Sequence, residues 1–60
     1  MREDVIDKMV QWKLTNLRLG RTQEDPDGAM YRLMGEASME ELGEALNRVY
    51  AATTSDEWVH

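Results

Sequence analysis

The side chains that could do chemistry in this chain are mostly carboxylates. The 60 residues include 12 Asp and Glu, one histidine and no cysteine. The histidine, His60, is the last residue, and Ser38 and Ser55 are better explained as a helix cap and a tail residue. No nucleophile, general base and orienting group can be assembled from these residues, and the carboxylates lie on predicted polar helix faces rather than in an apolar pocket. The sequence therefore predicts a protein that is not an enzyme and holds no cofactor.

The one acidic loop, residues 22–28, is the place where a metal ion could be held. A calcium-binding EF-hand loop needs oxygen ligands at alternating positions over about twelve residues, the last a Glu, but here the sequence becomes apolar directly after Gly28. We therefore predict no metal site. Instead, Asp25 is expected to be the N-cap of a helix, with Pro26 at its first position and Asp27 in its first turn. A plain turn is the alternative interpretation of the same residues.

Residues 35–47 resemble in their spacing the turn and second helix of helix-turn-helix repressors. The shared features are a serine, Ser38, an apolar residue four positions later and an apolar pair seven and eight positions later. The resemblance implies a transcriptional regulator whose second helix reads DNA. The turn is one residue longer than in these repressors, however, and the helix carries Glu40, Glu41 and Glu44 where phosphates would approach. A degenerate helix-turn-helix regulator therefore stays as an alternative, and nucleic-acid binding is not the expected activity.

The charges divide unevenly along the chain. Residues 1–21 carry five basic and three acidic side chains, a net +2, whereas residues 22–60 carry two basic and nine acidic ones, a net −7; together these give the chain's −5. This asymmetry favours docking of the first segment on the second, within one chain or between two copies. Glu40, Glu41 and Glu44 are predicted to face a partner. In a further alternative, the acidic residues imitate nucleic acid and occupy a partner's basic groove. The residues of this acidic face are Glu24, Asp25, Asp27, Glu36, Glu40, Glu41 and Glu44.

The elements that position these side chains begin with a helix over residues 3–19, which contains no Gly or Pro. At about 100° per residue, its apolar residues span an arc of about 220°. A helix that packs on one neighbour needs a stripe of only about 100°. This helix is therefore predicted to lie between two elements or to share one side with another subunit. The predicted partner-binding side consists of Val5, Met9, Trp12 and Leu19.

Two shorter helices follow. The second is expected over residues 26–34, ended by Gly35, and is too short to be stable alone. The third begins with the capping-box pattern of Ser38 and Glu41. Its apolar residues fall within about 140°, which predicts a single seam. The residues of this seam are Leu42, Ala45, Leu46 and Val49, with Met39 and Tyr50 at its edges. The sequence thus predicts one all-α domain over residues 1–60, a small bundle of a long, a short and a medium helix that dimerisation could complete.

The last residues, 53–60, are polar except for an abrupt Trp58. We expect this tail to fold its indole back onto the helices, because a tryptophan carries a large apolar surface. The alternative is a flexible tail in which Trp58 anchors the chain on a partner.

Length and composition then decide between function classes. A domain of this size without a disulfide or zinc site buries little core, so oligomerisation or partner binding is expected. No apolar stretch is long enough to cross a membrane and no secretory signal is present, which predicts a cytoplasmic protein. We predict a non-catalytic protein-interaction module: a small acidic inhibitor or adaptor, typical of regulators from phages or mobile elements. It would form a homodimer or dock on a larger host protein.

Overall fold

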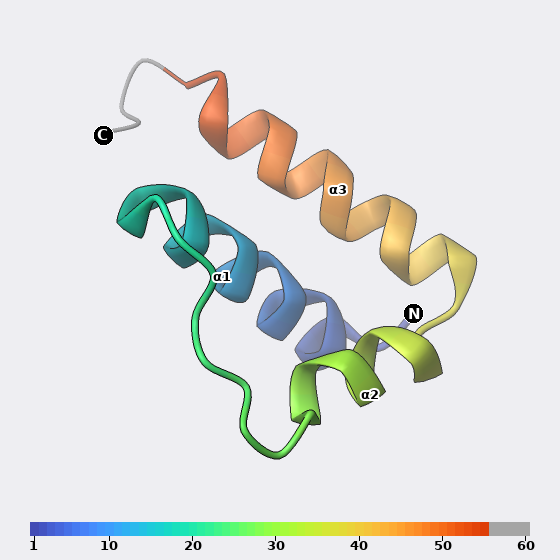
Figure 1. The fold of residues 1–60 in the computed structure, drawn as a ribbon. Helices are drawn as coiled ribbons and strands as arrows, with labels where there is room; N and C mark the ends of the chain where they lie inside the picture. Colours follow the sequence, from blue (N-terminus) through green and yellow to red (C-terminus); the bar gives the residue numbers. More distant parts are fainter. Residues whose placement is uncertain (56–60) are drawn as a thin grey trace.

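A computed structural model describes residues 1–55, and in this part of the chain it contains three α-helices and no strand (Figure 1). The helices are α1 (Glu3–Leu19), α2 (Ala29–Glu36) and α3 (Met39–Thr53). The predicted all-α class, with a long, a short and a medium helix in that order, is confirmed. Trp58 and His60 lie outside the described residues, so the predictions for the tail stay predictions.

The three helices are arranged around α1. Figure 1 shows α1 and α3 side by side and running in the same direction, with α2 across the first turns of α1. Because two parallel helices need a long return, the chain after α1 runs back along it before α2 begins (Figure 1). Gln23 ties this return segment to α1: its backbone N–H donates to Asn16 Oδ1 at 2.9 Å and its side-chain amide donates to the Trp12 carbonyl at 3.3 Å.

The core is built almost entirely from α1. Ile6 is completely buried, and Ala45 of α3 is the one buried apolar residue that another helix contributes among residues 1–55. The remaining buried apolar residues are Val5, Met9, Val10 and Leu14. Since α1 packs against both α2 and α3, its wide apolar arc is covered largely within the chain itself. This is one of the two arrangements that the sequence predicted.

The ends of α1 and α3 follow their local sequences. Gly20 ends α1 in the left-handed conformation, with φ 70°, and its N–H donates to the Asn16 carbonyl at 2.9 Å. The predicted capping box at the start of α3 is confirmed: the Glu41 N–H donates to Ser38 Oγ at 3.1 Å, and the Ser38 N–H donates to Glu41 Oε1 at 2.8 Å. These reciprocal bonds satisfy two backbone donors that an uncapped helix leaves free.

The predicted bounds of α2 are wrong at both ends. Asp25 and Gly28 close a turn, with the Gly28 N–H donating to the Asp25 carbonyl at 3.0 Å, and the helix begins only after Gly28. Gly28 has φ 64°, a conformation that directs the chain out of the turn and suits glycine. The Asp25 carboxylate still caps the helix, because it accepts from the Met30 N–H at 3.2 Å. At the other end, Gly35 lies inside α2, and the helix stops where Ala37 becomes extended.

Candidate functional site: the apolar face of α3

The candidate site is a line of exposed residues on α3. Met39, Leu46 and Tyr50 are 83%, 66% and 71% exposed, and Gly43 lies exposed between them. At about 100° per residue, these four positions fall within about 60° of one another, so they form one straight stripe, here named the outer row. Figure 1 shows α3 along one edge of the molecule, with α1 on one side and no other helix of the described part on the opposite side. Contiguous exposed apolar surface of this kind marks interaction sites.

The other side of α3 explains why the outer row is exposed. Glu41 and Ala45 are the two residues of α3 that are fully buried, and they lie against α1. Around the helix, at about 100° per residue, Ala45 is about 100° and Glu41 about 140° from the nearest residue of the outer row. The predicted seam of α3 is therefore right only in part: Ala45 is buried and Leu42 and Val49 pack against the core, but Leu46 is exposed. The core takes the side centred on Glu41 and Ala45, and the larger apolar side chains Leu46 and Tyr50 are left outside it.

An ion pair between the half-exposed Arg2 and the buried Glu41 fixes this rotation of α3. The Glu41 carboxylate, in a residue only 3% exposed, accepts four hydrogen bonds. Arg2 donates three of them: its backbone N–H at 2.8 Å and its Nε at 3.1 Å to Oε2, and its Nη2 at 3.0 Å to Oε1. The fourth comes from the Ser38 N–H of the capping box. Arg2 also donates to the Glu36 carbonyl at 3.2 Å, so it joins the start of α1 to the α2–α3 corner.

The same contacts set the charge of Glu41. The guanidinium of Arg2 and then the backbone N–H groups of Ser38 and Arg2 hold the pKa of this carboxyl well below its ordinary value of 4.5. Glu41 is therefore ionised but already neutralised within the chain. The prediction that Glu41 lies on an exposed acidic face is wrong. Its charge is paired with Arg2, and both of its carboxylate oxygens accept hydrogen bonds from Arg2 or Ser38.

A groove between α1 and α3 adjoins the outer row. It has a volume of about 490 Å³, and its apolar lining comes mainly from α1 and α3. The principal lining residues are Met9, Trp12, Met34, Leu42, Leu46 and Val49. Leu46 belongs to both the groove and the outer row, so the apolar surface continues from Trp12 to Tyr50. Lys13 and Asn16 add polar groups to the lining.

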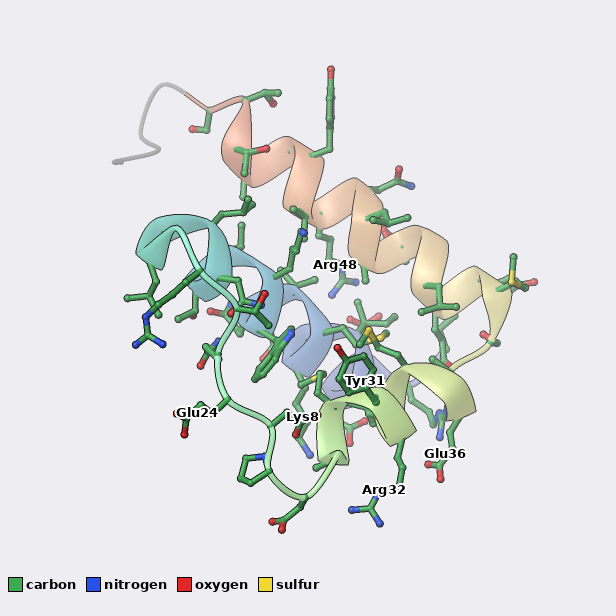
Figure 2. The ribbon with its side chains drawn as sticks, in the orientation of Figure 1. Lys8, Glu24, Tyr31, Arg32, Glu36 and Arg48 are labelled. Carbon is green, nitrogen blue, oxygen red and sulfur yellow. The ribbon has the colours of Figure 1, made fainter. Side chains whose placement is uncertain are left out.

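Trp12 separates this groove from a smaller hollow on the side of α2. The hollow measures about 310 Å³ and is bounded by polar residues of α1, by Gln23 and by Met30 of α2. Figure 2 shows how three charged side chains of α2 and α3 are directed. Arg48 points from α3 towards α1, whereas Arg32 and Glu36 of α2 point away from the other two helices. Trp12 is half-buried, with apolar surface left on the groove side.

The structure does not bring the predicted partner-binding residues of α1 onto one surface. Val5 and Met9 are buried in the chain's own core, so their predicted exposure to a partner is wrong. The physical reason is that α2 and α3 together cover the wide apolar arc of α1. Leu19 is exposed at the far end of α1, in a separate hollow with Arg21 and Glu24. Of this group, Met9 and Trp12 line the groove beside the outer row, and of these two only Trp12 is more than marginally exposed.

The three predicted acidic residues of α3 differ in the same way. Glu40 is exposed, Glu41 is buried, and Glu44 is half-buried with its Oε1 at 3.9 Å from Arg48 Nε. Arg48 is also bound to Glu3 Oε2 at 2.8 Å, which gives α3 a second ion pair with α1. Glu41 is therefore not part of an exposed acidic surface with Glu40 and Glu44.

The helix-turn-helix resemblance also loses support. Because Gly35 continues α2, only Ala37 and Ser38 connect α2 to α3, and the turn is shorter rather than longer than expected. Helix-turn-helix motifs have turns of about three to four residues. At the start of α3, which would enter the DNA groove, Glu40 is exposed.

The outer row was not predicted as a site, although its signal is in the sequence. Positions 39, 43, 46 and 50 have the 4-3-4 spacing of a helix–helix seam. Within residues 1–55, no group of three His, Cys, Asp or Glu side chains has a metal-binding arrangement, and no helix is long and apolar enough to span a membrane. Comparison of the chain with protein-family models, curated proteins and solved structures found no significant match.

Proposed function

We propose that this chain is a non-catalytic protein-interaction module, a small acidic inhibitor or adaptor of the cytoplasm, and that the outer row of α3 with the adjoining groove is its docking surface. The observation that carries the proposal is the exposure of Met39, Leu46 and Tyr50 in one line. In a chain with only six buried apolar residues among those described, leaving three large apolar side chains in water is unfavourable unless a partner covers them.

The chemistry of the surface favours a protein partner over a small molecule. Tyrosine and methionine are enriched in the centres of protein interfaces, where a polar rim surrounds them. Here Glu40 and Asn47 flank the outer row as exposed polar residues, and the groove beside it opens towards Trp12. A straight apolar stripe next to a shallow groove suits a partner helix, which would place its own apolar residues at helical spacing along it.

A matched pair of tyrosines allows a direct test. Tyr50 in the outer row and Tyr31 in α2 are 71% and 70% exposed, so they offer the same residue type with the same access to solvent. A photo-crosslinking amino acid is placed at position 50 in one variant and at position 31 in the other, and both are irradiated in living cells that express the chain. We expect a discrete adduct from position 50 and none from position 31.

The adduct must also depend on the docking surface. A second change, Leu46→Glu, places a charge in the middle of the outer row and should abolish the adduct from position 50. Circular dichroism of the same variant should show unchanged helix content, because Leu46 is largely outside the core. Equal adducts from positions 31 and 50, or none from either, would overturn the proposed function.

A further inference from the structure

We propose that the partner on the outer row is a second copy of this chain, and that two α3 helices pair antiparallel in a symmetric dimer. This inference rests on the proposed function, since it identifies the partner that the docking surface receives. Three properties of the outer row support it: its steric self-complementarity, the arrangement of charge beside it, and the continuity of the apolar surface on its other flank.

The steric argument concerns Gly43. A two-fold axis between positions 44 and 45 places Met39 opposite Tyr50 of the partner subunit and Gly43 opposite Leu46 of the partner subunit. The largest side chains then lie at the ends of the seam and a leucine meets a glycine at its centre, so the helices can approach closely. In a parallel pair, Gly43 would instead face its own copy and leave a gap.

Gly43 has no other explanation within the chain. Its surroundings contain no atom within 4 Å of where a Cβ would lie, so neither packing nor a turn requires glycine at this position. Glycine weakens the interior of a helix relative to alanine. Close approach of a second helix gives this residue a function that the single chain does not.

The charge argument concerns the two flanks of the outer row. One flank carries Glu40 and Asn47. In the antiparallel register, Glu40 of each copy lies beside Asn47 of the partner subunit, so the Glu40 carboxylates of the two copies are kept apart. Arg48 and Glu44 are engaged with each other, with Arg48 pointing towards α1 (Figure 2). The other flank carries Leu42 and Val49, which line the groove and continue the apolar contact.

Single cysteines test the register, because the chain has none of its own. In the antiparallel pair, two copies of residue 39 are about 16 Å apart along the helix axis, beyond the ~7 Å between Cα atoms that a disulfide can bridge. Met39→Cys and Tyr50→Cys should therefore not cross-link alone, whereas an equimolar mixture of the two should form a disulfide. Tyr31→Cys, mixed with each in turn, is the control for random collision.

The expected results separate this inference from the proposed function. Light scattering over a hundredfold range of concentration should show twice the 7.0 kDa mass of one chain at the upper end. Added salt should strengthen the dimer, because each copy carries a net charge of −5. A disulfide from either single variant would overturn the antiparallel register. Cross-linking no greater than with Tyr31→Cys would overturn the dimer.

The two failures are distinguishable by the photo-adduct. If the adduct from position 50 has the mass of this chain joined to a different protein, and no self-adduct forms, the second copy is the wrong partner but the docking surface stands. If position 50 gives no adduct at all, both are wrong. Because Met39 and Tyr50 are exposed, their replacement should leave the fold intact, and the helix content of each variant checks this.

Discussion

At the scale of single residues, the contact that most constrains the fold is the Arg2–Glu41 pair. It joins the second residue of the chain to the first turn of α3, and Glu41 accepts four hydrogen bonds in a position almost closed to water. Removing Arg2 would leave the Glu41 carboxylate buried without its partner, and removing the Glu41 charge would take from Arg2 its main hydrogen-bond acceptor. The Glu3–Arg48 pair is a useful comparison, because it also links α1 to α3 but Glu3 is largely exposed.

We expect Glu41→Gln to lower the thermal unfolding midpoint at pH 7 clearly more than Glu3→Gln does. The pKa of Glu41 is depressed in the folded chain, so its ionisation contributes stability above the unfolded pKa of 4.5, and this stability is lost as the pH falls below that value. The difference between wild type and Glu41→Gln should therefore narrow as the pH is lowered from 7 to 3. Thermal unfolding followed by circular dichroism measures it. A difference that stays constant over this range would contradict the role given to Glu41.

At the scale of elements, the sequence predicted helix identity well and helix ends unevenly. The capping box of α3 is local, since Ser38 and Glu41 satisfy each other's backbone, and it could be recognised from spacing alone. The start of α2 could not be, because Asp25 can cap a helix directly or through an intervening turn. The left-handed Gly28 makes the second arrangement available. The sequence is compatible with a helix that starts directly after Asp25 and with one that starts after the turn, and the packing of α2 on α1 selects the second.

Asp25→Ala should therefore destabilise the chain by about 1 kcal/mol, the usual effect of losing an N-terminal helix cap. The Asp25 carboxylate accepts from the N–H groups of Met30 and Tyr31. Asp27→Ala is the matched control: it removes a neighbouring carboxylate for which no hydrogen bond to the helix is observed among residues 1–55. Urea unfolding gives the free energies, and amide hydrogen exchange should locate the loss in α2. Equal effects of the two substitutions would show that Asp25 acts only through its charge.

The outer row yields a prediction about α3 in which stability and association move in opposite directions. Gly43→Ala should stabilise the isolated chain by about 0.5–1 kcal/mol, because alanine is the better helix former and its methyl group meets no other atom. The same methyl group would stand between two closely packed helices and weaken the dimer. Unfolding at low concentration and light scattering at high concentration measure the two effects separately. A variant that is more stable and associates equally well would remove the reason for glycine at this position.

At the scale of the whole molecule, the sequence correctly indicated that the chain has more apolar surface than it can bury, but it assigned the excess to the wrong helix. Counting the apolar arc of α1 could not reveal that α2 and α3 would cover Val5 and Met9. Nor could the sequence show which apolar residues of α3 are buried and which are exposed. That depends on the ion pair with Arg2, which holds Glu41 in the interior and so leaves Leu46 and Tyr50 on the outside. The arc of one helix is a local property, whereas which part of it is covered depends on contacts between residues 39 positions apart.

The proposed dimer would make the stability of the whole chain depend on its concentration, because the excess surface on α3 would be covered only in the dimer. A folded dimer in equilibrium with unfolded monomers gains stability as concentration rises, and a hundredfold increase contributes up to about 2.7 kcal/mol per dimer through mass action. The unfolding midpoint of the wild type should therefore rise across that range, while the midpoint of Leu46→Glu should stay constant. At the lowest concentration the two proteins should unfold at similar temperatures, because Leu46 contributes little to the core of a single chain. If the wild-type midpoint does not change with concentration, the three helices are stable without a second copy, and the outer row remains free for a different protein.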